Sequence, residues 1–210
     1  MSQGTAKASS TKRQSQERRN ELLLAAVRAI RRLGAQATMS EIAIEARCSK
    51  PVFYDYFGDK RGLSIAITDK MLGDLENVFE VLLDSSKDTR ETVRSAIDVF
   101  VSFAAKEPEL YRFLVQGTLN PGTVNTLPPM LPSIAVVVVK YLERELTKSG
   151  HDVEPAETIA VAILGMVFST TEWWLVVRGY LPDNYVEHLT DLVCGGLYGC
   201  GIQSTALGSI

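Results

Sequence analysis

Hydrogen-bond donors are concentrated in a short stretch near the N-terminus of the chain. Arg47, Ser49, Lys50, Tyr54 and Lys60 bring guanidinium, hydroxyl and ammonium groups together there. Such donors suit the oxygen acceptors of phosphate groups and the edges of nucleic-acid bases. The stretch therefore indicates a binding surface, and the surrounding helices must be what positions it.

Residues 38–63 are predicted to form two short helices separated by a tight turn. In the first helix, apolar residues recur at positions i, i+3, i+4 and i+7, namely Met39, Ile42, Ala43 and Ala46. In the second helix, Phe53 and Phe57 are four positions apart on the inner face. The outward positions are left mainly to Lys50, Val52, Tyr54 and Asp55. A helix, a short turn and a second helix is the arrangement that places a recognition helix in the DNA major groove.

The ends of the second helix also carry clear signals. Ser49 stands where an N-cap oxygen would accept from the free amides, and Pro51 follows in the first turn, where its missing N–H is not needed. Gly58 is expected to end this helix, and Asp59 can cap a third helix that begins at Lys60.

The string SEIAIEARCSKPVFYDYFGDKRGL resembles the N-terminal helix-turn-helix of TetR-family transcriptional regulators. Residues shared with that motif are Ile42, Ala43, Ala46, Ser49, Lys50, Tyr54, Tyr56, Phe57, Lys60 and Leu63. Two positions depart from it. Arg47 stands where the family usually has a glycine in the turn, so a residue with a Cβ must adopt that backbone conformation or the turn must shift. Ile44 is apolar where a polar residue is common.

Roles in DNA binding can be assigned as hypotheses to Thr38, Arg47, Ser49, Lys50, Pro51, Val52, Tyr54, Asp55 and Lys60. Ser49, Lys50, Tyr54 and Lys60 are predicted phosphate contacts, and the resemblance supports the last two. Pro51 and Val52 could pack on thymine methyl groups, Asp55 could accept from a cytosine amino group, and Arg47 could reach a phosphate or a base. An alternative for Tyr54 is a half-buried aromatic residue that supports the helix.

Charge is divided unevenly along the chain, whose overall net charge is −3. Residues 1–62 hold 12 Lys and Arg against 6 Asp and Glu, whereas the remaining residues hold 10 against 19. A basic N-terminal part on an acidic body fits a DNA-binding head on a body that does not bind DNA. Residues 1–15 are expected to be a disordered basic arm, either in contact with DNA or simply solvated.

Composition is that of a globular protein, with 46% hydrophobic and 22% charged residues. No uninterrupted apolar run approaches the roughly 20 residues that cross a bilayer, so we expect no membrane span. The three cysteines, Cys48, Cys194 and Cys200, match no metal or disulfide framework. Without an apolar N-terminal signal sequence, the chain is expected to be cytoplasmic.

The predicted fold class is all-α: a three-helix helix-turn-helix head over residues 16–62 and a larger helical body over 63–205. Amphipathic patterns predict helices over about 16–33, 60–83, 89–106, 108–116 and 133–149. The segment 117–132 contains four prolines and is expected to be mostly irregular. The long helix that begins at Lys60 would link the head to the body.

Two final helices, over residues 154–179 and 183–202, indicate a homodimer. The first is apolar almost all round, so in a small body one side should meet another subunit. Gly195, Gly196, Gly199 and Gly201 in the second would allow another backbone to come close. The resemblance supports this prediction independently, because TetR-family proteins dimerise through their last two long helices. The alternative is that both helices are internal core. A dimer would bind a palindromic double-stranded DNA operator.

The resemblance further implies a repressor released when a small molecule binds in the body. Candidate lining residues are Phe79, Phe100, Phe103, Tyr111, Phe113, Met130, Met166, Phe168, Trp173 and Trp174. No cationic cluster is visible among them, which favours a lipophilic, weakly polar ligand such as a fatty acyl compound, a steroid or a hydrophobic drug. For each of them, plain core is the alternative.

An enzyme is not indicated, and no cofactor or metal is predicted. His151 and His188 lie near no nucleophile in the sequence, and no phosphate-binding loop, HExxH or CxxC spacing occurs. Two other functions stay open: a helical ligand-binding protein without operator specificity, which Arg47 in the turn would favour, and a ligand-dependent activator.

Overall fold

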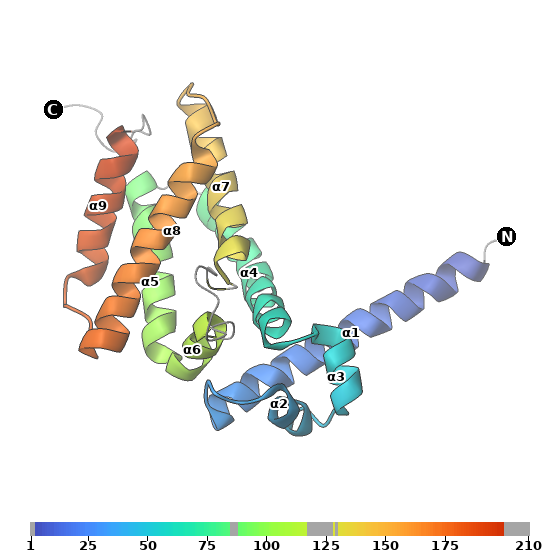
Figure 1. The fold of residues 1–210 in the computed structure, drawn as a ribbon. Helices are drawn as coiled ribbons and strands as arrows, with labels where there is room; N and C mark the ends of the chain where they lie inside the picture. Colours follow the sequence, from blue (N-terminus) through green and yellow to red (C-terminus); the bar gives the residue numbers. More distant parts are fainter. Residues whose placement is uncertain (1–2, 85–87, 117–127, 129, 200–210) are drawn as a thin grey trace. The chain divides into compact units, whose positions relative to one another are not determined.

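The computed structural model describes residues 3–84, 88–116, 128 and 130–199, and its side chains over 13–73, 88–115, 128 and 130–196. Every regular element in these residues is helical, which confirms the predicted all-α class (Figure 1). The elements are α1 (Gln3–Leu33), α2 (Met39–Glu45), α3 (Lys50–Phe57), α4 (Lys60–Asp84), α5 (Thr89–Lys106), α6 (Pro108–Gln116), α7 (Met130–Lys148), α8 (Ala156–Glu172), the π-helix η1 (Trp173–Arg178) and α9 (Tyr185–Gly199).

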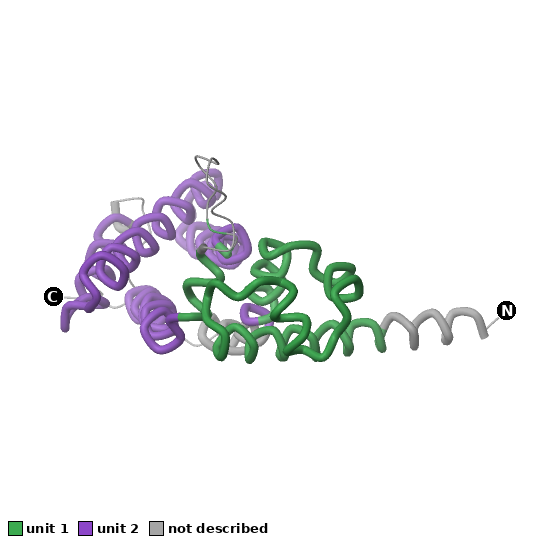
Figure 2. Tube along the Cα trace, turned by 60° about the horizontal axis from the view of Figure 1, so that its bottom comes forward, with its two compact units in different colours: residues 1–70, 109–130 green, residues 71–108, 131–210 purple. Residues whose placement is uncertain are grey.

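The chain divides into two compact units, coloured separately in Figure 2. Unit 1 comprises residues 1–70 and 109–130, and unit 2 comprises residues 71–108 and 131–210. We expected the boundary after residue 62 and a head formed by the N-terminal residues alone. The structure instead divides α4 after Lys70 and assigns α6 to the head unit.

The N-terminal arm is the first correction. Residues 1–15 were expected to be disordered, but α1 begins at Gln3 and continues without interruption to Leu33. The segment contains no proline, and Arg13 forms an i,i+4 ion pair with Glu17 at 3.1 Å. Since extending an existing helix fixes only one residue at a time, a polar segment without helix breakers can join the helix that follows it.

The predicted helix-turn-helix is present as α2 and α3. Their buried residues, Met39, Ile42, Ala43, Phe53 and Phe57, match the expected inner faces. Gly58 ends α3 with a φ of 70°, and Asp59 caps α4 by accepting from the Gly62 amide at 2.8 Å. A Cβ at Gly62 would lie 2.1 Å from the Phe57 carbonyl oxygen, so only glycine fits this turn between the two helices.

Unit 2 is built from α5, α7, α8 and α9, with the larger part of α4. The bounds of α5 match the prediction, whereas α7 begins at Met130, earlier than the expected residue 133. Most of the proline-containing segment 117–132 lies outside the described residues. Its expected irregular structure is therefore not tested over 117–127 and 129.

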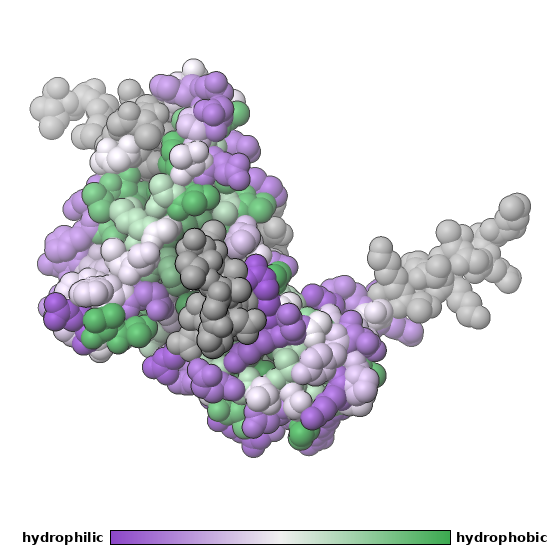
Figure 3. Space-filling view, in the orientation of Figure 1, coloured by the Kyte–Doolittle hydropathy of each residue, from purple (hydrophilic) through white to green (hydrophobic). Residues whose placement is uncertain are grey.

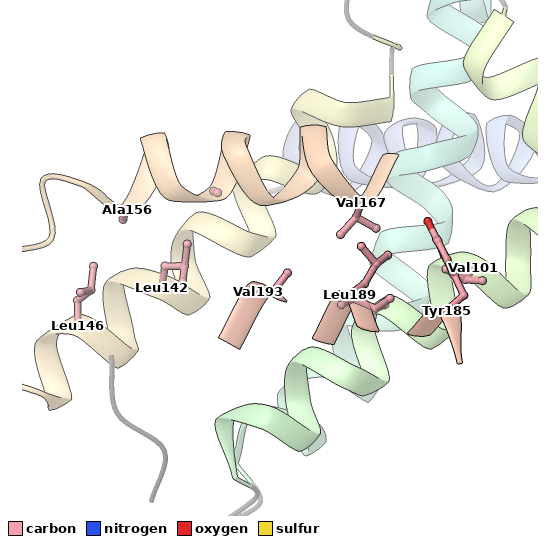
Figure 4. Close-up of a cluster of buried hydrophobic side chains, with 10 residues drawn as sticks. Val101, Leu142, Leu146, Ala156, Val167, Tyr185, Leu189 and Val193 are labelled. Atoms are coloured by element: carbon pink, nitrogen blue, oxygen red, sulfur yellow. The ribbon is translucent and has the colours of Figure 1, made fainter. Parts of the chain in front are cut away.

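Apolar side chains from four helices meet in the interior of unit 2. Figure 4 shows Val101 of α5, Leu142 and Leu146 of α7, Ala156 and Val167 of α8, and Tyr185, Leu189 and Val193 of α9 in one cluster. Each helix contributes residues three or four positions apart, which lie on one face of an α-helix. Burial of these faces stabilises the body and fixes the order in which its helices pack.

Polar bonds fix the point where α8 changes to η1. The Thr171 and Tyr185 hydroxyls lie 2.9 Å apart in the interior, and Tyr185 also donates to the Thr170 hydroxyl at 2.9 Å. Gly179 ends η1 in the left-handed conformation with a φ of 76°. A π-helix is uncommon and often occurs at functional positions. The sequence pattern predicted a continuous α-helix to residue 179, so this change of helix type was missed.

One stretch of unit 2 bears on the expectation that no segment crosses a membrane. One helical stretch in the described residues, the 23 residues Ala156–Arg178, is long and apolar enough by length and composition, with a mean hydropathy of 1.6 in its most apolar 18-residue window. Counting uninterrupted apolar runs missed it, because Gly165 and the polar residues 169–172 divide its apolar sequence. Only 17% of its most apolar window is buried inside the chain.

Candidate DNA interface and effector-binding residues

The recognition helix α3 is supported from behind by aromatic packing. Phe53 and Phe57 are buried, with ring centroids 4.9 Å apart in an edge-to-face arrangement. The Arg19 guanidinium lies 5.7 Å from the Phe57 ring centroid, which ties α1 to the same core. Because the inner face is fixed in this way, the opposite face of α3 is held at a defined orientation.

That opposite face carries the predicted DNA contacts. Lys50, Pro51, Val52, Tyr54 and Asp55 are all exposed. Val52 and Tyr54 each expose 43% of their surface. The Tyr54 ring is thus accessible but partly covered, and its predicted roles in contacting phosphate and in supporting the helix both stay predictions. The structure places these five side chains on one accessible helix, as predicted.

The N-terminus of α3 is open. Ser49 has the extended backbone of an N-cap residue, but its side chain makes no capping hydrogen bond. The sequence predicted the position of the cap correctly and its hydrogen bond incorrectly. An uncapped helix N-terminus presents free amides and the positive end of the helix dipole, which together favour an anion such as a phosphate.

Arg47 occupies the turn between α2 and α3 in the left-handed conformation, with a φ of 51°. Its amide donates to the Ile44 carbonyl at 3.0 Å, and the Cys48 amide donates to the Ala43 carbonyl at 3.0 Å. This pair of bonds is the Schellman arrangement, whose left-handed position is usually glycine. The first of the two predicted solutions is therefore correct: the turn keeps its geometry and arginine takes the glycine conformation.

Thr38 caps α2 through a reciprocal pair of bonds with Glu41. The Glu41 amide donates to the Thr38 hydroxyl at 3.2 Å, and the Thr38 amide donates to the Glu41 carboxylate at 2.8 Å. The same hydroxyl donates to that carboxylate at 2.7 Å, and these bonds lower the pKa of Glu41. Thr38 is exposed, so it stays a predicted DNA contact, but its hydroxyl also has this structural role.

Lys60 differs from the other predicted phosphate contacts, because its ammonium is used inside unit 1. Its Nζ donates to the Ala35 carbonyl at 2.9 Å and lies 4.8 Å from the Phe113 ring centroid. Partial burial lowers the pKa of this lysine. The structure thus does not bring Lys60 into the exposed set, and a phosphate contact would compete with the bond to Ala35.

The Ala35 peptide is held on both sides. Its amide donates to the Glu109 carboxylate of α6 at 2.8 Å, while its carbonyl accepts from Lys60. We call this arrangement of Ala35, Lys60 and Glu109 the Ala35 clamp. It joins α6 to the turn between α1 and α2. Sequence analysis missed Glu109, because bonds between residues 74 positions apart leave no local pattern.

The predicted effector-binding residues fall into two groups in the structure. Tyr111, Phe113 and Met130 are buried in unit 1, whereas Phe100, Met166 and Trp174 pack against the core cluster of unit 2. Phe103 and Phe168 are half-buried in unit 2, and the Phe79 side chain lies outside the described residues. The sequence analysis placed all ten residues in the body. The structure instead divides them between the two units.

Trp173 is the clearest departure within this set. It was predicted to line an interior pocket, but 52% of its surface is exposed. The Arg178 guanidinium lies 5.8 Å from its ring centroid, and both residues belong to η1. Val161 and Ser169, at four-residue multiples before Trp173, are exposed as well, so Trp173 lies on the side of α8 and η1 that the unit leaves uncovered.

Unit 2 exposes an apolar face on its last helices. Val161 of α8, Trp173 and Val177 of η1 and Leu192 of α9 expose between 48% and 60% of their surfaces. Figure 3 shows hydrophobic side chains at the surface of this unit, among hydrophilic ones. Four-residue spacing connects Val161, Gly165, Ser169, Trp173 and Val177 in a row, and a Cβ at Gly165 would meet nothing within 4 Å.

A helix-turn-helix head with an open recognition helix, followed by a separate helical body, defines a DNA-binding transcriptional regulator. The family described as bacterial regulatory proteins of the tetR family matches residues 22–67, and the tetracyclin repressor-like C-terminal domain matches residues 78–206. The chain belongs to the TetR family.

Individual relatives agree with this membership. An uncharacterised HTH-type transcriptional regulator of Mycobacterium tuberculosis is 32% identical over 89% of this chain and 79% of its own length. The HTH-type transcriptional activator FasR of Mycolicibacterium smegmatis is 28% identical over 86% of this chain and 83% of its own length.

One solved structure shows the same fold at low sequence identity. Thermus thermophilus FadR, a TetR-family transcriptional repressor in complex with lauroyl-CoA, aligns with a TM-score of 0.66 and 18% identity. The alignment covers 91% of this chain and 99% of that one.

Proposed function

We propose that the protein binds a palindromic operator as a homodimer and represses transcription until a fatty acyl-CoA ligand releases it. The observation that carries the DNA-binding part is the open face of α3, where Ser49, Lys50, Val52 and Tyr54 are exposed while Phe53 and Phe57 fix the helix from behind. One such helix contacts few phosphates. Two copies related by a two-fold axis contact twice as many and read both half-sites.

The dimer is proposed to form through α8, η1 and α9. The row from Val161 to Val177 is apolar at both ends and has small residues, Gly165 and Ser169, in its middle. Helices that pack along their four-residue ridges approach most closely where the side chains are small. Gly195 and Gly196 of α9 are exposed and offer a second place for close approach. A second copy of the chain would bury this face.

The same face is also what makes Ala156–Arg178 apolar enough for a membrane. We favour a protein partner over lipid, since Thr171 and Tyr185 hold this helix inside a helical unit and Glu172 and Arg178 lie towards one end. We therefore place the protein in the cytoplasm, where its DNA partner is, and assign no catalytic role to it.

The ligand class is proposed from one solved structure with the same fold. FadR of T. thermophilus was crystallised with lauroyl-CoA, and its fold extends over nearly the whole of this chain. The half-buried Phe100, Met166 and Trp174 of unit 2 provide the apolar surroundings that an acyl chain requires. Such a ligand releases DNA only if it binds more tightly to the conformation that does not fit the operator.

A second candidate is an activator that needs the ligand. The relative that favours it is FasR, an activator with sequence similarity over 86% of this chain. The two candidates place the ligand in the same body, and they differ in the sign of its effect on DNA binding and in where the operator lies in the promoter.

The test begins with selection of bound sites from a random duplex DNA pool by the purified, ligand-free protein. An enriched palindrome is expected. Operator affinity is then measured by fluorescence anisotropy with lauroyl-CoA, with free CoA and laurate as controls. Repression predicts that lauroyl-CoA alone weakens binding, whereas a ligand-dependent activator predicts tighter binding. Folded protein that enriches no sequence would contradict operator recognition and leave a ligand-binding protein.

A further inference from the structure

The turn before the recognition helix contains a residue in a costly conformation. Arg47 is the only non-glycine residue with a positive φ among those that the structure describes. The left-handed region brings the Cβ of an L-residue too close to its carbonyl oxygen, so glycine adopts it at lower free energy. The Schellman bonds of the turn involve only backbone atoms, and glycine would make the same bonds.

No contact of the Arg47 side chain with the described residues offsets the free-energy cost of its left-handed backbone. It is exposed, and it forms no hydrogen bond, ion pair or aromatic contact with the side chains that the structure describes. A positive charge at the end of α2 would interact with that helix dipole, but α2 has only 7 residues. Strain that a structure keeps without an internal benefit indicates a role in binding something else.

The position of Arg47 suggests what that partner is. It precedes Ser49, the uncapped N-cap of α3, by two residues, and Lys50 by three. All three are exposed, and none of them is on the inner face of the motif. A side chain on the turn lies beside the recognition helix, and roughly half to two-thirds of protein–DNA hydrogen bonds go to phosphates and sugars. The planar guanidinium fork binds the oxygens of a phosphate in pairs.

We propose that Arg47 is an additional phosphate anchor at the start of the recognition helix, and that the head gives up stability to hold it in the left-handed turn. This inference rests on the proposed operator binding. It makes Arg47 a residue with opposite effects on two measurable properties: its removal raises the stability of the head and lowers the affinity for DNA.

Three substitutions separate the charge from the strain. Arg47→Gly removes both, Arg47→Gln removes the charge and keeps a strained side chain, and Arg47→Lys keeps charge and strain but loses the planar fork. Each variant is compared with the wild-type protein on the operator selected by the wild-type protein. Affinity is measured over a range of salt concentrations, and thermal unfolding is followed by far-ultraviolet circular dichroism.

Arg47→Gly is expected to raise the unfolding temperature of the head by about 2–4 °C, whereas Arg47→Gln should leave it near the wild-type value. Both should weaken operator binding by about tenfold or more. Both should also reduce the slope of log affinity against log salt by about two, since a dimer loses two phosphate contacts. Arg47→Lys should retain the slope and bind with intermediate affinity.

Unchanged affinity and slope in Arg47→Gly would overturn the anchor, and a lower unfolding temperature in that variant would overturn the strain argument. A new base preference at one operator position would mean that Arg47 reads a base, which contradicts a phosphate contact. Lower stability of Arg47→Gln with unchanged affinity would show that the charge acts only on α2. Failure of the wild-type protein to bind any operator would contradict the proposed function instead.

Discussion

The two units of the molecule differ in how far contacts within the chain satisfy and cover their helices. In unit 1, the ends of the short helices are tied by local bonds, with Thr38 and Glu41 at the start of α2 and Asp59 at the start of α4. The Ala35 clamp adds bonds between residues distant in sequence. These contacts lie within one unit of one chain, so the recognition helix is positioned before any partner binds.

Unit 2 has a packed interior but an open exterior. The residues of its core cluster are buried, yet α8 and η1 expose Val161, Trp173, Val176 and Val177. A large apolar surface in water is unfavourable unless another molecule covers it. The comparison teaches that the bonds positioning the recognition helix lie within one chain, whereas the body leaves exposed the apolar face that the proposed dimer would cover. Four substitutions test this difference, and they are ordered by the size of the expected effect.

The largest effect is expected from a charge on the open face. Val176→Glu places two carboxylates in a symmetric interface, and each uncompensated buried charge costs about 3–5 kcal/mol. The dimer should dissociate, and operator affinity should fall by at least about 1,000-fold. Analytical ultracentrifugation and anisotropy measure the two effects.

Val136→Glu is the matched control, because Val136 of α7 is also a valine and also exposes 55% of its surface. It should leave the protein dimeric. If both variants remain dimers, the interface does not lie on α8, η1 and α9; if both dissociate, the interface is not confined to them.

A cavity introduced into the head should lower the stability of unit 1 and leave the unfolding of unit 2 unchanged. Phe53→Ala removes a fully buried ring that packs on Phe57, at a cost of about 3–5 kcal/mol. Both tryptophans of the chain, Trp173 and Trp174, lie in unit 2, so tryptophan fluorescence follows only the body. The fluorescence transition and the dimer should persist, while part of the helical circular dichroism signal melts at lower temperature and DNA binding is lost.

Val52→Ala is the control for that experiment, since Val52 is the exposed neighbour of Phe53. It should leave the stability of the head unchanged. A shift of the tryptophan transition in Phe53→Ala would show that the body depends on the head, and the comparison drawn above would then be wrong.

A smaller effect is expected at the Ala35 clamp. Glu109→Ala leaves the Ala35 amide without its acceptor, which should lower the free energy of unfolding of the head by about 1–2 kcal/mol. Glu109→Gln keeps an oxygen that can accept from this amide and should restore most of the loss. Urea unfolding followed by circular dichroism measures both variants. Equal losses in the two would mean that the carboxylate charge, rather than the bond to Ala35, stabilises the head.

The smallest effect is expected at the surface of unit 2. Glu187 of α9 pairs with Arg90 and Arg94 of α5, and the hydrogen bond from Arg94 lowers the pKa of Glu187. Its contribution to stability is therefore present above the ordinary glutamate pKa and is lost as pH falls through the lowered value. Glu187→Gln should destabilise the body slightly at neutral pH and low salt, and not at all in strong acid.

Salt gives an independent check, since screening weakens exposed ion pairs. Thermal melts at neutral pH should show the difference between wild-type protein and Glu187→Gln shrinking as salt is added. Glu143→Gln, at an exposed position in the interior of α7, is the control and should match the wild type throughout. A difference that persists at high salt would mean that Glu187 stabilises the body by packing.

Most of the fold could be predicted from the sequence, because it depends on local patterns. Helix faces follow from apolar spacing, which placed Phe53 and Phe57 in the core of α3, and helix ends follow from Gly58 and Asp59. The left-handed turn at Arg47 was also among the predicted solutions. In each of these cases a few neighbouring residues determine the backbone.

The candidate sites divide in the same way. Exposure of Lys50, Val52, Tyr54 and Asp55 followed from the periodicity of one helix. The inward position of Lys60 did not, because its partners Ala35 and Phe113 come from other parts of unit 1. The exposure of Trp173 did not either, because the packing of the other helices decides which side of α8 and η1 is covered. Sequence spacing cannot reveal that side when the residues are apolar on every side.

By itself, the sequence determined the all-α class, the helix-turn-helix and the basic head on an acidic body, since these depend on residues close together along the chain. Only the tertiary structure decided that α6 belongs with the head, that Glu109 and Lys60 hold Ala35 from both sides, and which face of α8 and η1 stays uncovered. These features depend on which distant side chains meet when the helices pack, and no local pattern specifies those contacts.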